Sequence, residues 1–374
     1  MRVTFVLPQV SLSGGMRVLA IYADRLWRRG HDVTVVSVPP IKWSLLVKAR
    51  SLVAGRGLPK DYSGEPSFFN DAAVPHHTLN TARPVTDDDV PDADIVLATF
   101  WRTASWVAAL SPRKGAKAIL LQGYETSGDY DPAIDAAWRL PLSKIVVSKW
   151  MLKLAYDRFD DSSVYLVPNS VDTTQFFAPP RRKQEIPTVG ILYSTLHLKG
   201  VDIALAALRQ VRERIKNLRV VALGKEPVST ELALPRWCEY YRQPAQDSIR
   251  DIYSKCDLWL CSSRQEGFHL PPLEAMACRC PVVSTSVGGP IDVVENGVNG
   301  YLVPIADVKA LADRITELLS FGDARWRAMS DAALATATRY TWDDATDLLE
   351  DALREILNSN IKASSVDKCR GAER

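Results

Sequence analysis

The stretch Glu266-Gly-Phe-His-Leu-Pro-Pro-Leu-Glu274 places two carboxylates eight positions apart, around a glycine and two prolines. It follows the apolar run Asp257–Ser263, which is typical of a buried parallel strand. Pro271 and Pro272 suit the first turn of a helix, where a missing N–H costs nothing. The sequence therefore predicts a strand, a loop that carries Glu266, and a helix with Glu274 in its first turn.

This arrangement indicates a binding site with two kinds of chemistry. Ligands of open α/β sheets bind beyond the carboxyl ends of the strands, and a helix N-terminus offers free N–H groups to an anion. A carboxylate does not bind a phosphate, but it accepts hydrogen bonds from sugar hydroxyls. We therefore expect a ligand with both phosphate and sugar hydroxyls. A glutamate in a first helical turn also favours the helix dipole and needs no ligand, and this alternative stays open.

The sequence that follows the glutamate pair makes the pattern more specific. It continues to Cys280-Pro-Val-Val-Ser-Thr-Ser-Val-Gly-Gly-Pro-Ile-Asp-Val-Val-Glu-Asn-Gly-Val-Asn-Gly-Tyr-Leu-Val-Pro304. The whole stretch from Glu266 to Pro304 resembles the signature of family 4 retaining glycosyltransferases. The resemblance implies an α/β protein with two Rossmann-like domains facing each other across a cleft, the GT-B fold. It also implies a nucleotide-diphosphate sugar as co-substrate, with no further cofactor.

The pattern along the chain predicts the same organisation. Strands and helices alternate from residue 3, and the alternation restarts after the turn-rich segment Pro168–Pro180. We expect residues 61–92, which show no clear period, to form either an ordered excursion or a mobile loop. The expected division is an acceptor domain at 1–180, a donor domain at 186–341, a terminal helix at 342–358 that crosses back to the first domain, and a disordered tail at 359–374.

The resemblance assigns donor-binding roles to the first motif. Glu274 resembles the residue that binds the ribose through vicinal hydroxyls, and Glu266 the residue that faces the donor sugar. The backbone N–H groups of Gly267, Phe268 and His269 are expected to approach the phosphate or the sugar, and Leu270 to form the floor. The His269 side chain has two open alternatives, a ligand contact or simple packing.

A cation is expected where the leaving diphosphate develops charge. Lys199-Gly200 follows the apolar run Thr188–Tyr193 and opens a helix, so Lys199 lies at a strand-to-helix turn. The alternative is an ordinary surface lysine. The family usually pairs this lysine with an arginine five residues earlier, and here that position is Ser194. A second departure is Arg279, which stands where the family prefers glycine and is expected to be solvated.

The first domain contributes candidates on the other side of the cleft. Gly14 and Gly15 lie between a strand and a helix and resemble the Gly-Gly loop of the family, although a tight turn alone explains them. Gln122-Gly-Tyr-Glu125 follows a buried strand and resembles a run of rhamnosyltransferase-like members that build surface polysaccharides. We expect acceptor contacts from Gln122, Tyr124, Glu125, Trp101 and Arg102, with core or loop roles as the alternative for Trp101, Tyr124 and Glu125.

Composition excludes several other classes. The 374 residues carry a net charge of +2 and contain 47% hydrophobic and 24% charged residues, so nothing indicates a nucleic-acid partner. There is neither an apolar run of about 18 residues nor the pattern of a signal peptide. The six scattered cysteines are interpreted as buried thiols of a reducing cytoplasm. Cys278 and Cys280 fit no zinc spacing, and we expect no metal site.

Together with these patterns, the family resemblance implies a retaining, metal-independent hexosyl- or deoxyhexosyltransferase acting on a saccharide or lipid-linked saccharide acceptor in cell-surface glycan synthesis. The alternative is a carbohydrate-binding or scaffold protein that kept the fold and lost turnover. Residues 41–57 mix Trp43 and leucines with Lys42, Lys48 and Arg50. Such a basic amphipathic segment predicts peripheral binding to an anionic membrane surface, although a helix packed on the first domain would show the same pattern.

Overall fold

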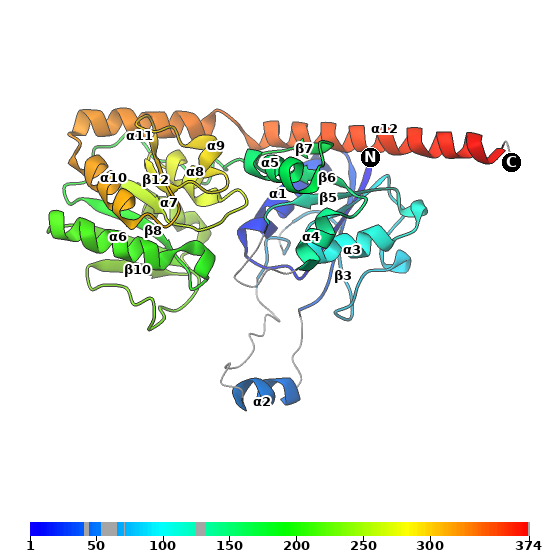
Figure 1. Cartoon of the computed structure of the whole chain (residues 1–374), viewed down its shortest axis with the longest axis horizontal. Coiled ribbons are helices and arrows are strands. Elements are labelled where there is room, and N and C mark those ends of the chain that lie inside the picture. Colours follow the sequence, from blue (N-terminus) through cyan, green and yellow to red (C-terminus); the bar gives the residue numbers. More distant parts are fainter. Residues whose placement is uncertain (41–44, 54–65, 71, 125–131, 373–374) are drawn as a thin grey trace.

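The protein consists of two parallel sheets, each covered by helices on both faces (Figure 1). The computed structural model describes residues 1–40, 45–53, 66–70, 72–124 and 132–372. The two sheets lie in separate lobes that face each other, and the chain passes from the first to the second between residues 166 and 188. The expected fold class, two Rossmann-like α/β units in the GT-B arrangement, is confirmed.

The first sheet has seven parallel strands in an order that reverses direction between its third and fourth members. The strands lie side by side as β3 (His76–Thr78), β2 (Asp32–Ser37), β1 (Arg2–Leu7), β4 (Ile95–Ala98), β5 (Ala116–Leu121), β6 (Ser143–Val146) and β7 (Val164–Leu166). The inner strands read as apolar runs because helices cover both faces. All four residues of β4 are buried, and the register pairs Val3 of β1 with Val33 of β2 and Ile95 of β4.

The second sheet repeats this topology with six parallel strands. They lie side by side as β10 (Cys238–Arg242), β9 (Arg219–Gly224), β8 (Thr188–Tyr193), β11 (Leu258–Cys261), β12 (Val282–Thr285) and β13 (Gly300–Val303). Trp259 of β11 pairs with Gly190 of β8, and its indole fills the space that a side chain at residue 190 would occupy. The apolar run Thr188–Tyr193 forms β8, as expected.

Helices connect the strands of each sheet. Those of the first lobe are α1 (Gly14–Arg28), α2 (Leu45–Val53), α3 (Trp101–Ala109), α4 (Pro132–Trp138) and α5 (Lys149–Phe159), with the 3-10 turns η1 (Asp87–Asp89) and η2 (Pro112–Lys114). Those of the second lobe are α6 (Val201–Arg214), α7 (Ile249–Ser254), α8 (Leu270–Ala277), α9 (Pro290–Val293), α10 (Val308–Ser320) and α11 (Asp323–Thr338), with η3 (His197–Lys199) and η4 (Gln246–Ser248). Among the described helices, none is long and apolar enough to cross a membrane.

The order of the strands determines where a ligand can bind. In each sheet the connections reverse direction between two central strands, β1 and β4 in the first and β8 and β11 in the second. The loops leaving such a pair diverge to opposite faces and open a crevice at the carboxyl edge of the sheet. The Gly14–Gly15 turn leaves the first sheet at this point, whereas Lys199 and Glu266 leave the second.

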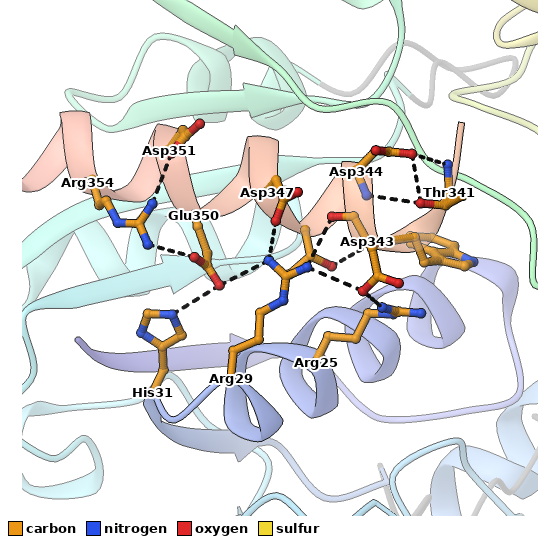
Figure 2. A network of polar contacts seen from close by, with 12 residues as sticks. Arg25, Arg29, His31, Thr341, Asp343, Asp344, Asp347, Glu350, Asp351 and Arg354 are labelled. Atoms are coloured by element: carbon orange, nitrogen blue, oxygen red, sulfur yellow. Dashed lines mark hydrogen bonds and ion pairs between the residues drawn. The ribbon is translucent and has the colours of Figure 1, made fainter. Parts of the chain in front are cut away.

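The terminal helix α12 (Trp342–Ala372) joins the two lobes by lying along the first one (Figure 1). Thr341 begins it with a capping box, in which Asp344 accepts hydrogen bonds from the backbone N–H and hydroxyl of Thr341, each at 2.7 Å (Figure 2). Its apolar face is buried and contacts α1 and β5. Arg25 and Arg29 of α1 pair with three acids of α12 at the rim of this contact: Asp343, Asp347 and Glu350.

One sequence expectation differs from the structure, and the structure adds detail to another. The segment expected as a disordered tail, 359–374, continues α12 as far as Ala372. Its composition is polar, but it contains no proline, and its first glycine is residue 371, so nothing ends the helix. The excursion at 61–92 contains β3, which extends the first sheet, and η1. A strand of three residues is too short to show a period in the sequence.

The contact between α1 and α12 gives a prediction on stability. Glu350 is buried, and Arg29, His31 and Arg354 lie 3.3, 3.2 and 2.7 Å from its carboxylate (Figure 2). Burial opposes ionisation, but the hydrogen bonds from His31 and Arg29 outweigh it and hold the pKa of Glu350 below its ordinary 4.5. We expect Glu350→Gln to lower the free energy of unfolding by roughly 1–2 kcal/mol at pH 7.

The sign of its pH dependence follows from that lowered pKa. The contribution of Glu350 is fully present above pH 4.5 and is lost as the pH falls through the lower native value. The difference between urea melts of the two proteins should therefore shrink as the pH falls from 4.5 through the lower native pKa of Glu350. Asp351→Asn, an exposed change on the same helix, should stay within about 0.5 kcal/mol of the wild type. An equal loss in both variants, or a gap that persists at low pH, would contradict this interpretation.

Candidate functional site

The two glutamates of the opening motif lie at the carboxyl edge of the second sheet. Glu266 is in the loop that leaves β11, as expected. Glu274 is the fifth residue of α8 and therefore lies at the start of its second turn, one turn later than expected. The helix begins at Leu270 because the prolines at 271 and 272 tolerate helical positions without a donor N–H.

Glu266 is the centre of a buried polar cluster. The Lys199 ammonium donates to both of its oxygens, at 2.8 and 2.9 Å, and the Ser263 hydroxyl donates at 2.7 Å. The His269 imidazole Nδ1 lies 3.1 Å from the same carboxylate. The side chains of Glu266 and His269 are 8% and 3% exposed, whereas that of Lys199 is 27% exposed and so keeps access to the cleft. Lys199 is thus a positioned cation.

Burial and neighbouring charge set the protonation states of this cluster. Burial alone would raise the pKa of Glu266, but the His269 and Lys199 charges and the hydrogen bonds from Lys199 and Ser263 lower it below its ordinary value. Burial lowers the pKa of His269 to about 4, against the opposing pull of Glu266. At neutral pH the cluster therefore holds an ionised Glu266 carboxylate and a neutral His269 imidazole.

Glu274 has partners in both lobes. Arg17 of α1 donates to one oxygen at 2.9 Å, and the Tyr253 hydroxyl of α7 donates to the other at 2.8 Å. The ion-paired side chains of Arg17 and Glu274 are 13% and 12% exposed. The Arg17 guanidinium also contacts the side-chain amide of Gln175 and lies 5.1 Å from the centre of the Phe176 ring. Burial raises the pKa of Glu274, although Arg17 and Tyr253 oppose that shift.

The loop between the glutamates contacts the first lobe directly. The Gly267 carbonyl accepts hydrogen bonds from the Ser148 hydroxyl at 3.1 Å and from the Trp150 indole at 2.7 Å. A Cβ at residue 267 would lie 1.6 Å from the Gln122 carbonyl oxygen, so only glycine permits this approach. The Gln122 side chain in turn donates to the Gly15 carbonyl at 3.1 Å. The glycine turn of α1 and the Glu266–Glu274 loop thus meet at one place.

The remaining donor-side candidates lie around this meeting point. Phe268 is buried, and Leu270 contacts the position of Gly14 from the second lobe. Ser194 ends β8, and its hydroxyl accepts a hydrogen bond from the Leu196 N–H. The structure therefore brings Gly14, Gly15, Lys199 and the motif residues together. The roles of these residues in donor binding stay predictions.

The structure places the acceptor-side candidates of the Gln122–Glu125 run in different surroundings. Gln122 lies between the lobes, as described above, and Glu125 lies outside the described residues. The Tyr124 ring packs in the core of the first lobe against Trp138, and its hydroxyl donates to Asp135 at 2.6 Å. Its core alternative therefore fits better than an acceptor contact.

Trp101 and Arg102 begin α3 at the carboxyl edge of the first sheet. The Arg102 guanidinium lies 4.8 Å from the centre of the Trp101 ring, and Trp101 remains partly exposed. An indole face beside an exposed guanidinium suits a sugar ring. These two residues stay predictions as acceptor contacts.

Sequence reasoning missed the partners that neutralise the glutamates. Arg17 and Ser263 lie next to recognised motifs, and the arginine two residues after the Gly-Gly turn was an available signal. Tyr253 carried no signal. Arg279, expected to be solvated, is mostly buried: it donates to the Ala178 carbonyl and pairs with Asp331, while its backbone has a φ of 58°. That left-handed backbone explains why glycine is preferred at this position.

The geometry supports binding of a ligand with both anionic and hydroxyl groups. Lys199 and the N-terminus of α8 face the meeting point of the lobes, beside the two carboxylates. Within the described ranges, no group of three or more His, Cys, Asp or Glu side chains could hold a metal ion.

Part of the chain is similar to a known protein family, and its sequence is similar to those of several enzymes. Residues 183–320 match the family model described as Glycosyl transferases group 1. The chain is 24% identical over 389 residues to D-inositol 3-phosphate glycosyltransferase of Mycobacterium leprae, which covers 91% of this chain and 88% of the relative. It is 30% identical over 194 residues to the enzyme of the same name from Corynebacterium urealyticum, covering 47% of this chain and 46% of the relative.

Comparison with solved structures supports the fold. HepE of Anabaena in complex with UDP and glucose superposes with a TM-score of 0.73, at 15% identity, over 95% of this chain and 99% of that one. The expected resemblance to group 1 glycosyltransferases, of the family 4 type, is therefore confirmed. The similarity to rhamnosyltransferase-like members of the family stays a prediction.

The buried His269 gives a prediction on protonation. Because burial lowers the pKa of His269 to about 4, its imidazole should remain neutral where an ordinary histidine titrates near 6.5. The unfolded chain takes up this proton first, so this residue removes stability as the pH falls from 6.5 towards 4. Imidazole NMR signals followed from pH 8 to pH 4 test this, with His269→Gln identifying the signal. A midpoint near 6.5 would contradict the prediction.

Proposed function

We propose that this protein is a retaining, metal-independent glycosyltransferase of the hexosyl- or deoxyhexosyl-transferring kind. It moves a sugar from a nucleotide-diphosphate donor to a saccharide or lipid-linked saccharide acceptor in cell-surface glycan synthesis. The observation that carries this proposal is the buried pair of glutamates at the point where the second sheet reverses its connections. The partly exposed Lys199 ammonium is held against one of them, Glu266.

Each part of the donor has a matching group in this site. The ribose hydroxyls fit Glu274, whose carboxylate is an acceptor of charge-assisted hydrogen bonds. The diphosphate fits the N-terminus of α8 and the Lys199 ammonium, which stabilise the charge that grows as the glycosidic bond breaks. Glu266 holds Lys199 in place and faces the donor sugar. A neutral His269 adds no charge to this environment.

The acceptor is proposed to lie against the first lobe, near Trp101, Arg102 and Gln122. The two lobes exclude water from the reacting groups when they close. Retention of configuration rests on the family resemblance. The alternative function, a carbohydrate-binding protein without turnover, is favoured by Ser194, because the usual cation is missing there. Release of nucleoside diphosphate in the presence of candidate acceptors separates the two functions.

Helix α2 supports a proposal on location. Leu46, Leu52 and Val53 are 75%, 55% and 90% exposed, and Figure 1 shows the helix apart from both sheets. Arg50 is exposed on the same helix. The flanking residues Lys42 and Trp43 of the predicted amphipathic segment lie outside the described residues. We propose that this segment holds the protein peripherally at an anionic membrane surface on the cytoplasmic side, close to a lipid-linked acceptor.

The two glutamates should respond differently to substitution. Glu274→Ala should weaken binding of donor and free nucleotide by about 10- to 100-fold, since buried hydroxyls lose a charged acceptor worth roughly 1.5–3 kcal/mol. Glu266→Gln should lower turnover more than it weakens nucleotide binding, because it releases Lys199. A thermal-shift screen of UDP-, GDP-, ADP- and dTDP-sugars selects the donor, and a donor at 100 times its Kd should add about 2.7 kcal/mol of stability.

Three outcomes would refute these roles. Unchanged nucleotide affinity in Glu274→Ala would remove the ribose assignment. If Glu274→Ala and Glu266→Gln had identical effects, the separate roles proposed for the two glutamates would be wrong. The same assay run with EDTA should show full wild-type activity, and complete loss that magnesium restores would contradict the metal-independent proposal.

Vesicle flotation tests the membrane proposal. We expect salt-sensitive binding to vesicles that contain phosphatidylserine, since each cation near an anionic bilayer adds about 1 kcal/mol. Neutralising Lys42, Lys48 and Arg50 together should abolish most of it. Binding that is equal on neutral and anionic vesicles, or none at low salt, would refute the proposal.

A matched control keeps the net charge constant between variants. Lys153, Lys309 and Arg327 are exposed cations on α5, α10 and α11, with side chains 75%, 80% and 52% exposed. Neutralising these three removes the same total charge away from α2. The control variant should retain vesicle binding. An equal loss of binding in both variants would mean that overall net charge, and not the α2 segment, determines vesicle binding.

A further inference from the structure

Arg17 of the first lobe reaches across to a glutamate of the second lobe. It lies in the first turn of α1, and its guanidinium donates to Glu274 of α8, 257 positions away in the sequence, at 2.9 Å. The guanidinium is held in place by Gln175 and by the Phe176 ring. The cavity that Arg17 and Glu274 line has a volume of about 10 Å³, which is no more than one water requires.

This contact conflicts with the role proposed for Glu274. A carboxylate that binds two ribose hydroxyls needs lone pairs on both oxygens, but Arg17 occupies one oxygen and Tyr253 the other. A ribose hydroxyl can share the Glu274 oxygen that accepts from Tyr253. The Arg17 guanidinium, in contrast, fills the space in front of the other oxygen. The ribose therefore enters only if Arg17 moves. This step rests on the proposed function.

The charge balance of the site indicates where Arg17 goes. Lys199 already neutralises Glu266, so a bound diphosphate shares that cation with a carboxylate. Once the ribose takes Glu274, the Arg17 guanidinium has lost its anionic partner inside a largely buried site. Leaving it unpaired is costly, and a guanidinium binds phosphate oxygens with a bidentate geometry that suits it. The turn at Gly14 and Gly15 anchors Arg17 beside the α8 loop.

We propose that Arg17 is a donor-binding residue that exchanges partners. In the donor-free protein it pairs with Glu274 across the two lobes. When the donor binds, the ribose hydroxyls take Glu274, and Arg17 binds the diphosphate. It thereby supplies the second cation that Ser194 does not provide, from the opposite lobe, so that diphosphate binding and closure of the lobes depend on the same side chain.

The test separates the ribose from the diphosphate. Calorimetric titration of the full chain uses the nucleoside and the nucleoside diphosphate of the base that the donor screen selects: uridine and UDP, guanosine and GDP, adenosine and ADP, or thymidine and dTDP. The affinities are compared for the wild type and Arg17→Gln. We expect the diphosphate to bind about 10- to 100-fold more weakly to Arg17→Gln, since a charged hydrogen-bond partner is lost. The nucleoside should bind at least as tightly as to the wild type, because its competitor for Glu274 is gone.

Two further variants keep the result interpretable. Arg17→Lys preserves the charge and should retain most of the diphosphate affinity, even if the neutral variant is unstable. Arg25→Gln is the matched control, because Arg25 lies two turns further along α1 and pairs with Asp343 instead. It should leave both affinities unchanged.

The contradicting results are distinct from those that refute the proposed function. Equal weakening of nucleoside and diphosphate in Arg17→Gln would make Arg17 a structural support of Glu274, and unchanged affinities for both would remove it from the site. Equal losses of diphosphate affinity in Arg17→Lys and Arg17→Gln would contradict a role for the positive charge of Arg17. A wild type that binds none of these nucleotides would instead refute the proposed function itself.

Discussion

The site depends on how two buried carboxylates are neutralised. Glu266 and Glu274 lie eight residues apart at one edge of the second sheet, and each is paired with a cation, Lys199 from the same lobe and Arg17 from the other. Unpaired charges at this depth would cost several kcal/mol each, so the two cations stabilise the fold. The same pairing couples the two lobes, because one of the two bonds crosses between them.

The topology makes this pairing possible. Both sheets reverse their connections between two central strands, and the loops that leave these strands face each other. The glycine at residue 267 permits a backbone approach to Gln122 that a side chain would block. The terminal helix α12 then fixes the first lobe through the ion pairs that Arg25 and Arg29 form with its acids (Figure 2).

Much of this could be predicted from the sequence, for physical reasons. Buried parallel strands appear as apolar runs, so the sheets and their order of appearance were evident, and Lys199 and Glu266 followed from their places after strands. The Arg17–Glu274 pair was not predictable from spacing, because only the folded topology brings α1 to α8. The helical tail was missed because a polar composition resembles disorder, although helix propensity there is adequate. Tyr124 has both a polar tip and a large ring, and sequence alone does not decide which of them is used.

The most direct test of the central claim is a crystal structure with the nucleoside diphosphate that the donor screen selects. The account predicts ribose hydroxyls within hydrogen-bonding distance of Glu274, with the diphosphate between the N-terminus of α8 and the Lys199 ammonium. A nucleotide bound elsewhere, or one that lies at this edge with Glu274 still paired to Arg17 and its ribose pointing away, would contradict it.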